Sequence, residues 1–122
     1  MSQLRHRPSL LLLLVALGSP GCRASSEPAR VELVARAPER GNWEPREIQL
    51  ARGQPVTLVI RNVDVVSHGF YVPALNLLVS DIRAGDVREI QFTPQQAGEF
   101  PFYCSVWCGD YHMDMRGKLI VR

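Results

Sequence analysis

The sequence predicts an all-β domain built as a sandwich or barrel, and three features indicate this. Short runs rich in β-branched and other apolar residues recur along residues 30–122. Turn-forming residues, mostly proline and glycine, separate these runs. Past the N-terminal segment, no window has the 3.6-residue periodicity of an amphipathic helix. Many short strands at such spacing favour packed antiparallel sheets.

Three runs in the first half of the domain predict strands. Apolar and polar residues alternate in residues 30–36 and, more regularly, in residues 47–50, so we expect two half-buried strands at edge or outer positions. Residues 55–62 read PVTLVIRN, are rich in β-branched side chains, and lie between Gly53 and a polar Asn-Val-Asp step. This third run gives the clearest strand of the chain.

Five more strands are predicted in the second half, and proline or glycine lies in the turns between them. They cover residues 69–72, 77–82, 87–92, 100–103 and 118–121. The stretch before the last strand contains two cysteines, one histidine and two methionines within twelve positions. Any chemistry of this protein is therefore expected there.

Residues 1–22 resemble an export signal, because Arg5 and Arg7 precede a short apolar run that ends in Gly-Ser-Pro-Gly before Cys22. The run is far shorter than the roughly 20 apolar residues that a spanning helix needs. Cys22 is similar to the lipid-modified cysteine of bacterial lipoproteins, and an ordinary cleavage site is the alternative. Residues 23–29 predict a tether and residues 30–122 the domain. We expect an exported protein, periplasmic or lipid-anchored at the membrane surface.

The charge of the predicted domain excludes nucleic acid as a partner. Of the 14 lysine and arginine residues, Arg5 and Arg7 belong to the predicted signal, which leaves 12 against 12 aspartate and glutamate residues in residues 23–122, the predicted tether and domain together. A domain so close to neutral lacks the basic stripe that nucleic-acid binding requires. A length of 122 residues corresponds to one domain.

The stretch from Cys104 to Met115 predicts a copper site. It reads CSVWCGDYHMDM and has the spacing C-x3-C-x3-H-x2-M. Copper prefers thiolate, imidazole and thioether donors, whereas zinc favours closed sets of cysteine and histidine without methionine. Past the predicted signal, the one histidine besides His112 is His68, where a loop meets a predicted strand. A single site could use both cysteines and both histidines.

Two simpler interpretations stay open. A C-x3-C pair in an exported protein can be a stabilising disulfide, although a disulfide requires neither His112 nor Met115. A mononuclear blue-copper site needs two histidines, one cysteine and a distant methionine, which would leave one thiol unused. We interpret Met113 as a packing or surface residue, because Met115 matches the spacing.

Together with His68, the CSVWCGDYHMDM run resembles the dinuclear CuA site of cytochrome c oxidase subunit II and of nitrous oxide reductase. The resemblance covers roughly residues 55–122. The HMDM end is similar to the reductase form, although Trp107 stands one position later than that family's loop tryptophan. The SHGFYVPAL run around His68 is closer to the oxidase form. The resemblance implies a cupredoxin-like Greek-key β-sandwich that binds two copper ions.

The resemblance also implies a role for each ligand. Cys104 and Cys108 would bridge the two coppers, and His68 and His112 would each bind one copper. Met115 and the backbone carbonyl of Val106 would be weak ligands. The oxidase has a glutamate at the position of Val106, near a second, hard metal ion, and valine has no side-chain oxygen for such an ion. This difference argues against membership of the oxidase itself.

Such a site suits single-electron transfer, because the resemblance implies that protein groups fill every coordination position and a stiff β scaffold restrains the ligands. We expect an electron carrier whose redox partner is a protein such as a c-type cytochrome or a terminal reductase. Two alternatives remain: a subunit II-like electron-entry component of a terminal oxidase or nitrous oxide reductase, and a copper storage or delivery protein.

Four aromatic residues flank the predicted ligands. Phe70 and Tyr103 fit an ordinary sandwich core better than a docking role. Trp107 and Tyr111 lie within the segment from Cys104 to Met115, which we call the ligand loop. They are candidates for the exposed edge of the site, where aromatic residues often contact a partner.

Overall fold

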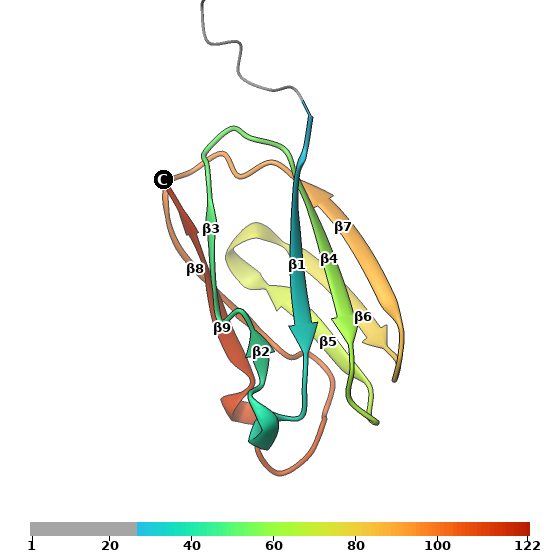
Figure 1. Cartoon of the computed structure of the whole chain (residues 1–122). Helices are drawn as coiled ribbons and strands as arrows, with labels where there is room; N and C mark the ends of the chain where they lie inside the picture. Colours follow the sequence, from blue (N-terminus) through green and yellow to red (C-terminus); the bar gives the residue numbers. More distant parts are fainter. Residues whose placement is uncertain (1–26) are drawn as a thin grey trace, which may run out of the picture.

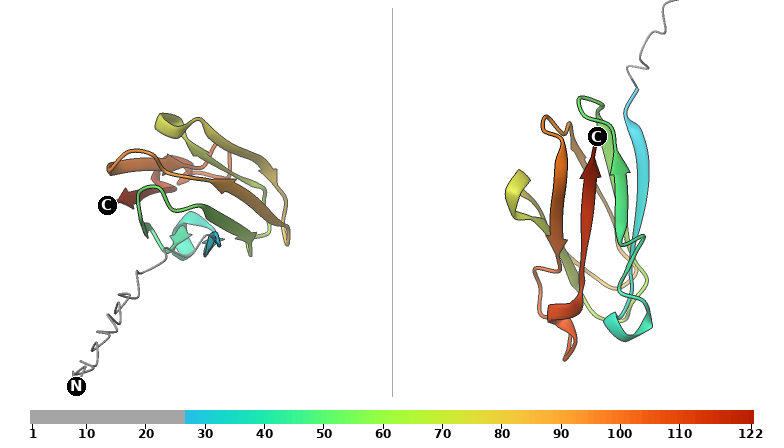
Figure 2. Two further views of the ribbon diagram at one scale, coloured as in Figure 1. Left: turned by 90° about the horizontal axis from the view of Figure 1, so that it is seen from above. Right: turned by 90° about the vertical axis from the view of Figure 1, so that its left-hand side faces the viewer.

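In the computed structural model, residues 27–122 are described and form a sandwich of two β-sheets (Figure 1). The strand order is β2-β1-β4-β7 in one sheet and β3-β9-β8-β5-β6 in the other. Figure 2 shows the two layers from above and from the side. The all-β sandwich prediction is confirmed. The predicted export signal and residues 23–26 of the predicted tether lie outside the described residues.

The four-stranded sheet is organised around β4, the strand that the sequence predicts most clearly. Its strands are β1 (Ala29–Ala35), β2 (Trp43–Glu44), β4 (Val56–Asn62) and β7 (Val87–Phe92). Strand β1 runs parallel to β4, and β7 runs antiparallel to it. The prediction of an edge or outer position is wrong for β1, because β2 pairs with its other side. With two residues, β2 is too short to give a periodic pattern in the sequence.

The five-stranded sheet carries the ends of the ligand loop. Its strands are β3 (Glu47–Leu50), β5 (His68–Val72), β6 (Leu77–Ile82), β8 (Gly98–Tyr103) and β9 (Arg116–Val121). All five begin within two residues of their predicted starts, and β3 lies at a sheet edge as expected. Strand β8 pairs antiparallel with β5 on one side and with β9 on the other. The ends of these three strands therefore lie next to one another.

The core between the sheets is dominated by three aromatic side chains that contact one another. The ring of Trp43 stands nearly perpendicular to those of Phe70 and Phe102, with centroids 6.0 and 5.8 Å away, a favourable aromatic geometry. Phe70 is buried, as expected. The core interpretation of Tyr103 is wrong, because side chains alternate along β8: Phe102 points inward and Tyr103 is 39% exposed.

The helices of the described region are three 3-10 helices of three residues each: η1 (Pro38–Arg40), η2 (Pro73–Leu75) and η3 (His112–Asp114). None of the helices within residues 27–122 is long and apolar enough to cross a membrane. In Figure 1, η1, η3 and the β4–β5 and β8–β9 connections gather at the lower end of the sandwich, whereas the C-terminus lies at the upper end.

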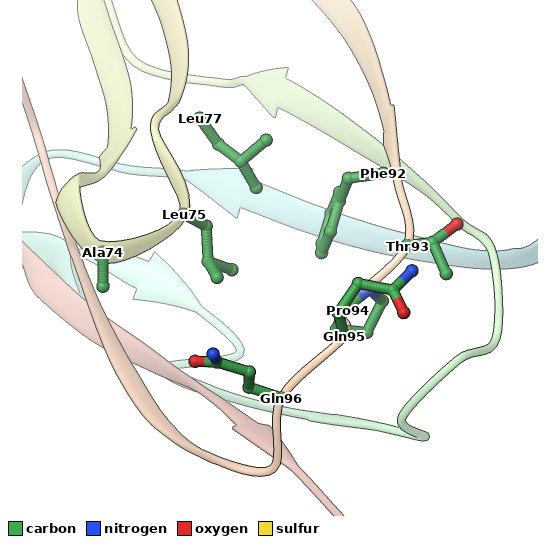
Figure 3. A pocket seen from close by; sticks show the side chains of 8 residues that line it. All are labelled: Ala74, Leu75, Leu77, Phe92, Thr93, Pro94, Gln95 and Gln96. Carbon is green, nitrogen blue, oxygen red and sulfur yellow. The ribbon is translucent and has the colours of Figure 1, made fainter.

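A pocket of about 330 Å³ lies away from that lower end, between η2, the start of β6 and the segment after β7 (Figure 3). Leu75 and Leu77 lie on one side of it and Phe92 on the other. Its remaining lining residues are Ala74, Thr93, Pro94, Gln95 and Gln96. This lining contains no cysteine, histidine, methionine or charged residue, so the pocket offers no soft donor for a metal ion.

Candidate metal centre

The three neighbouring strands β5, β8 and β9 bring distant parts of the sequence together at the lower end. His68 is the first residue of β5, as expected for a ligand at a strand end. Cys104 directly follows β8, and Met115 directly precedes β9. Cys108 and His112 lie in the loop between them. The sheet pairing thus fixes three of the predicted ligands, and the loop supplies the others.

Each cysteine thiol lies next to its own imidazole. The Sγ of Cys104 is 3.7 Å from Nδ1 of His68, and the Sγ of Cys108 is 3.4 Å from Nδ1 of His112. The ligand atoms of His68, Cys104 and Cys108 all lie within 4.8 Å of one another. Cys104 and Cys108 are both free cysteines, so the structure has no disulfide between them.

The two predicted weak ligands lie beside the thiols. The Sδ of Met115 is 3.8 Å from the Sγ of Cys108, and the Sγ of Cys104 donates to the carbonyl of Val106 at 3.1 Å. All six residues singled out from the sequence therefore meet in one small volume. Met113 is exposed, as expected for a residue outside the donor set.

Burial divides this cluster into two halves. The side chains of His68, Cys104 and Met115 are buried, with His68 fully enclosed. Cys108 and His112 are only partly buried. A small pocket of about 180 Å³, lined by Tyr103, Cys104, His112, Met113 and Met115, opens beside the cluster. One side of the site therefore faces the core and the other faces the surface.

Backbone hydrogen bonds close the ligand loop onto the sheet. The amide of Cys104 donates to the carbonyl of Met115 at 3.0 Å, which holds the two ends of the loop together. The amide of Ser105 donates to the carbonyl of Gly69 at 3.3 Å. A Cβ at Gly69 would collide with the Ser105 hydroxyl and lie 3.1 Å from Cγ2 of Val106. Glycine after His68 thus allows the loop to approach β5 closely.

Asp64 orients the buried histidine. The Nε2 of His68 donates to Oδ2 of Asp64 at 2.8 Å, and the Asp64 side chain is only 9% exposed. With the proton on Nε2, the lone pair of Nδ1 faces Cys104, which is the orientation that a metal ligand requires. The Asn62 side chain holds this loop by accepting from the Asp64 amide and donating to the carbonyls of Val66 and Ile82.

The electrostatics of the cluster favour one thiolate and resist a second. Burial opposes protonation of His68, but hydrogen bonds with Cys104 and then Asp64 outweigh it and raise the pKa of the imidazole. Burial likewise opposes ionisation of Cys104, yet the hydrogen bond with His68 lowers the pKa of this thiol overall. Burial and then the charge of Cys104 raise the pKa of Cys108 to about 12. Two thiolates side by side therefore need a compensating cation.

The donor set fits copper well. It combines two thiols, two imidazoles and one thioether, all from soft or borderline ligand classes. Metal binding deprotonates coordinating thiols, so a cation at this position would supply the charge that the paired cysteines lack. The nearby carboxylate of Asp64 is engaged by His68.

Apolar side chains are exposed around the outer half of the site. Trp107 is 70% exposed and lies against His112, with ring centroids 5.4 Å apart. Tyr111 and Met113 are also exposed, and Val65 of the β4–β5 loop is exposed at the same end. We call these four residues the apolar rim. The expectation that Trp107 and Tyr111 lie at the exposed edge agrees with their positions.

Several residues at the site were not recognised in the sequence. Asp64 and Asn62 appeared there only as a polar step before His68, although an acidic residue four positions before a candidate ligand is a usable signal. Asn42 and Trp43 contact the far end of the ligand loop. Both lie about 70 residues before Met115, Trp43 in a strand of two residues and Asn42 directly before that strand. No local pattern therefore links them to Met115.

Comparisons with known proteins agree with this architecture. Subunit 2 of cytochrome c oxidase from Thermus thermophilus is 30% identical over 80 residues, covering 66% of this chain and 58% of that protein. Nitrous-oxide reductase from Ralstonia nicotianae is 32% identical over 96 residues, covering 75% of this chain and 14% of the reductase. The chain thus spans less than two thirds of the length of these curated relatives.

A solved structure and a family match define the fold class. The periplasmic domain of subunit II of cytochrome oxidase from Bradyrhizobium japonicum superposes with a TM-score of 0.66 at 18% identity, covering 77% of this chain and 83% of that domain. Residues 9–121 match the cupredoxin-like domain family. The predicted cupredoxin-like fold is confirmed, and this chain belongs to the cupredoxin-like domain family.

Proposed function

We propose that this protein is an exported electron carrier that holds two copper ions in a dinuclear CuA-type centre. The observation that carries the proposal is the pairing of thiols with imidazoles: His68 with Cys104, and His112 with Cys108, at 3.7 and 3.4 Å. In this arrangement both cysteines would bridge the two ions, and each histidine would bind one ion. A mononuclear blue-copper site would leave one of these thiol–imidazole pairs without a role.

The remaining two donors complete the proposed centre. The Met115 thioether and the Val106 carbonyl each lie beside one of the two thiols. With these six groups, protein donors would fill the coordination positions of the two ions and would leave none open for a substrate, whereas catalytic metals generally keep one open. This arrangement supports a carrier rather than an enzyme.

The protein itself contributes to electron transfer by restraining the movement of the ligand side chains. When bound, the copper pair supplies a one-electron redox centre. His68 is held by Asp64, Cys104 is tied to Met115 through the backbone, and Phe70 and Phe102 pack in the core beneath. Ligands that move little between charge states keep the reorganisation that accompanies electron transfer small. The buried surroundings also influence the reduction potential.

The burial of the inner ligands disfavours a storage or delivery function. Copper handed from this site to another protein would have to leave His68, Cys104 and Met115, all of which are buried. We expect slow loss of copper to a strong chelator. Rapid loss would support a delivery protein instead.

The apolar rim is the surface we assign to the redox partner. Aromatic residues and methionine are enriched at protein interfaces, and Trp107 lies against the partly buried His112, which would shorten the path to the metal. A partner such as a c-type cytochrome or a terminal reductase fits this surface. The similarity to oxidase subunit 2 and nitrous-oxide reductase supports a second candidate, an electron-entry component of such an enzyme. Co-purification with a haem or catalytic copper subunit would favour it.

Export rests on the sequence of residues 1–22 and is tested separately. We propose that this segment is removed, and that Cys22 either carries a lipid or lies at an ordinary cleavage site. Mass spectrometry of the mature protein distinguishes the two, because lipidation adds acyl mass to an N-terminal cysteine. A mature protein that retains Met1 would contradict export.

Copper stoichiometry and electron paramagnetic resonance test the centre itself. We expect two coppers per chain, a purple protein and a mixed-valence spectrum. Cys108→Ser removes one bridge and should abolish that spectrum, while Val106→Ala keeps the backbone carbonyl and should retain it. One copper per chain with a blue-copper spectrum, or a mixed-valence spectrum that survives in Cys108→Ser, would overturn the assignment.

A further inference from the structure

The connection between β1 and β2 reaches across to the end of the ligand loop. Asn42 is fully buried and adopts φ of 67°, a left-handed conformation that asparagine tolerates better than most residues. Its Nδ2 donates to the carbonyl of Asp114, and its Oδ1 accepts from the amide of Trp43 at 2.7 Å. The Asn42 side chain thus fastens the residue just before Met115.

Trp43 makes a second contact one residue further along. Its indole Nε1 donates to the carbonyl of Met115 at 3.4 Å. The same carbonyl accepts from the amide of Cys104 at 3.0 Å. The backbone of Met115 is therefore tied both to the first cysteine and to an indole within the core.

The connection is itself firmly held, so it can act as a support. Trp43 pairs with Ala35 across the β1–β2 ladder. The amide of Arg36 donates to the carbonyl of Asn42 at 2.9 Å, and the amide of Asn42 donates to Ala37 at 3.2 Å. The Trp43 ring is packed against Phe70 and Phe102. Movement of this support would disturb the sheet and the core together.

The geometry points to Asn42 and Trp43 as positioning residues that fix the location of the Met115 thioether. This inference rests on the copper centre proposed above. It adds the two residues that hold the Met115 thioether, the weak side-chain ligand, in position. A methionine side chain is flexible and its bond to copper is weak. The position of Sδ then depends on how firmly the backbone is held. We call the side chains of Asn42 and Trp43, with their hydrogen bonds to the carbonyls of Asp114 and Met115, the latch. Because the axial ligand tunes the potential of copper sites, the latch sets part of the reduction potential.

The test is a double-mutant cycle on the copper-loaded protein. Trp43→Phe removes the indole donor and keeps an aromatic ring in the core, and Asn42→Asp keeps the shape and the acceptor but loses the donor to Asp114. Each variant is made in the wild type and in Met115→Leu, and the reduction potential and resonance spectrum are measured. Coupled residues show non-additive effects.

We expect each latch variant to shift the potential in the same direction as Met115→Leu and by less. In the Met115→Leu background, where no thioether remains to be positioned, the same variants should leave the potential unchanged. Equal shifts in both backgrounds would show that the latch acts independently of the thioether and would overturn the inference. Wild-type potentials in both latch variants would overturn it too.

Two controls separate positioning from general damage. Val56→Ala removes buried side-chain volume at the start of β4, remote from the ligand loop, and should lower stability without moving the potential. Asn42→Gly keeps a residue suited to the left-handed backbone but lacks the amide, so it should behave like Asn42→Asp. If Asn42→Gly instead has the wild-type potential, the Asn42 side chain does not position Met115.

Nuclear magnetic resonance of the metal-free protein tests the contacts of Asn42 and Trp43 without copper. The chain has two tryptophans, so the exposed Trp107 serves as an internal reference for Trp43. The Trp43 indole proton should exchange with solvent more slowly than that of Trp107, and the Met115 methyl resonance should broaden or shift in Asn42→Asp. A protein that binds no copper would refute the proposed centre. An unchanged Met115 methyl resonance in Asn42→Asp would refute the latch.

Discussion

The two halves of the ligand cluster differ in how the fold holds them. The inner half, His68, Cys104 and Met115, is buried, and each residue lies in or directly beside the end of a strand. The outer half, Cys108 and His112, is partly buried and belongs to the loop. The sheet therefore fixes the positions of the inner half, whereas the outer half lies close to the surface, where a partner can reach it.

Hydrogen bonding explains the difference. The inner residues are held by contacts between distant parts of the chain, such as the pairing of His68 with Ile82 across β5 and β6 and the bond from the Trp43 indole to the carbonyl of Met115. In the outer half, the backbone bond of His112 is local and runs from its amide to the carbonyl of Gly109 at 3.0 Å. Local turns open at lower free energy than strands packed on a core.

The largest difference between the two halves is expected when His68 and His112 are each replaced by alanine and the free energies of unfolding are compared. Both variants should lose the two-copper spectrum. In the metal-free protein, His68→Ala should lower the free energy of unfolding by roughly 2–4 kcal/mol, because it leaves a hole and an unpaired, nearly buried Asp64. His112→Ala should change it by less than about 0.5 kcal/mol. Urea denaturation measures both values, and equal losses would contradict the division into halves.

The glycines that border the loop give the next largest effect. A Cβ at Gly117 would collide with the backbone carbonyl of Arg46 and with the buried ring of Phe102. The Arg46 carbonyl also accepts from the amide of Lys118 at 2.8 Å, which limits its movement. Gly117→Ala should therefore cost about 2–3 kcal/mol of stability, as measured by thermal or urea unfolding.

Gly69→Ala should cost less than Gly117→Ala, about 1 kcal/mol. The nearest atom that the new Cβ would meet is the Ser105 hydroxyl, which can rotate away, whereas strand backbone cannot. Adding Ser105→Ala removes that hydroxyl and should restore much of the lost stability and copper content. If Ser105→Ala gives no rescue, then the close approach of the loop to β5 is not what requires glycine here.

A smaller effect is expected from Asp64→Asn, which removes the charge that supports His68 from behind. Carboxylates behind a ligating histidine raise its basicity, and their loss typically costs about 10–100-fold in metal affinity. Asp110→Asn is the matched control, since it removes the same charge from an exposed position in the β8–β9 loop, which carries Cys108 and His112. Competition with a copper chelator measures both affinities. A similar loss in both variants would indicate a general charge effect and no specific role for Asp64.

Much of the fold could be predicted because its signals are local. Residues 47–50 alternate and residues 55–62 are rich in β-branched residues, and they form β3 and β4. The failures have a shared cause: β2 is too short for periodicity, and its pairing with β1 is what moves β1 away from the edge. Pairing between strands is a property of the whole chain, which a local pattern does not contain.

The same distinction applies to the site. The spacing from Cys104 to Met115 is local and predicts the donors of the loop, and the position of His68 at the start of a predicted strand adds a second histidine. The roles of Asp64, Gly69 and Trp43 depend on side-chain contacts made only after folding. Sequence patterns therefore identify the candidate donors, whereas the groups that orient them appear only in three dimensions.

The smallest effect on the folded protein is expected at the apolar rim. Trp107→Ala should change the stability of the metal-free protein by less than about 0.5 kcal/mol, because the side chain is 70% exposed. The copper spectrum should remain, while electron exchange with a c-type cytochrome, followed by stopped-flow absorbance, should slow. Leu78→Ala removes an exposed apolar side chain from β6, outside the rim, and should leave the rate unchanged. If Leu78→Ala slows the exchange as much as Trp107→Ala, the outer half of the site is not where the partner binds, and its exposure reflects loop geometry alone.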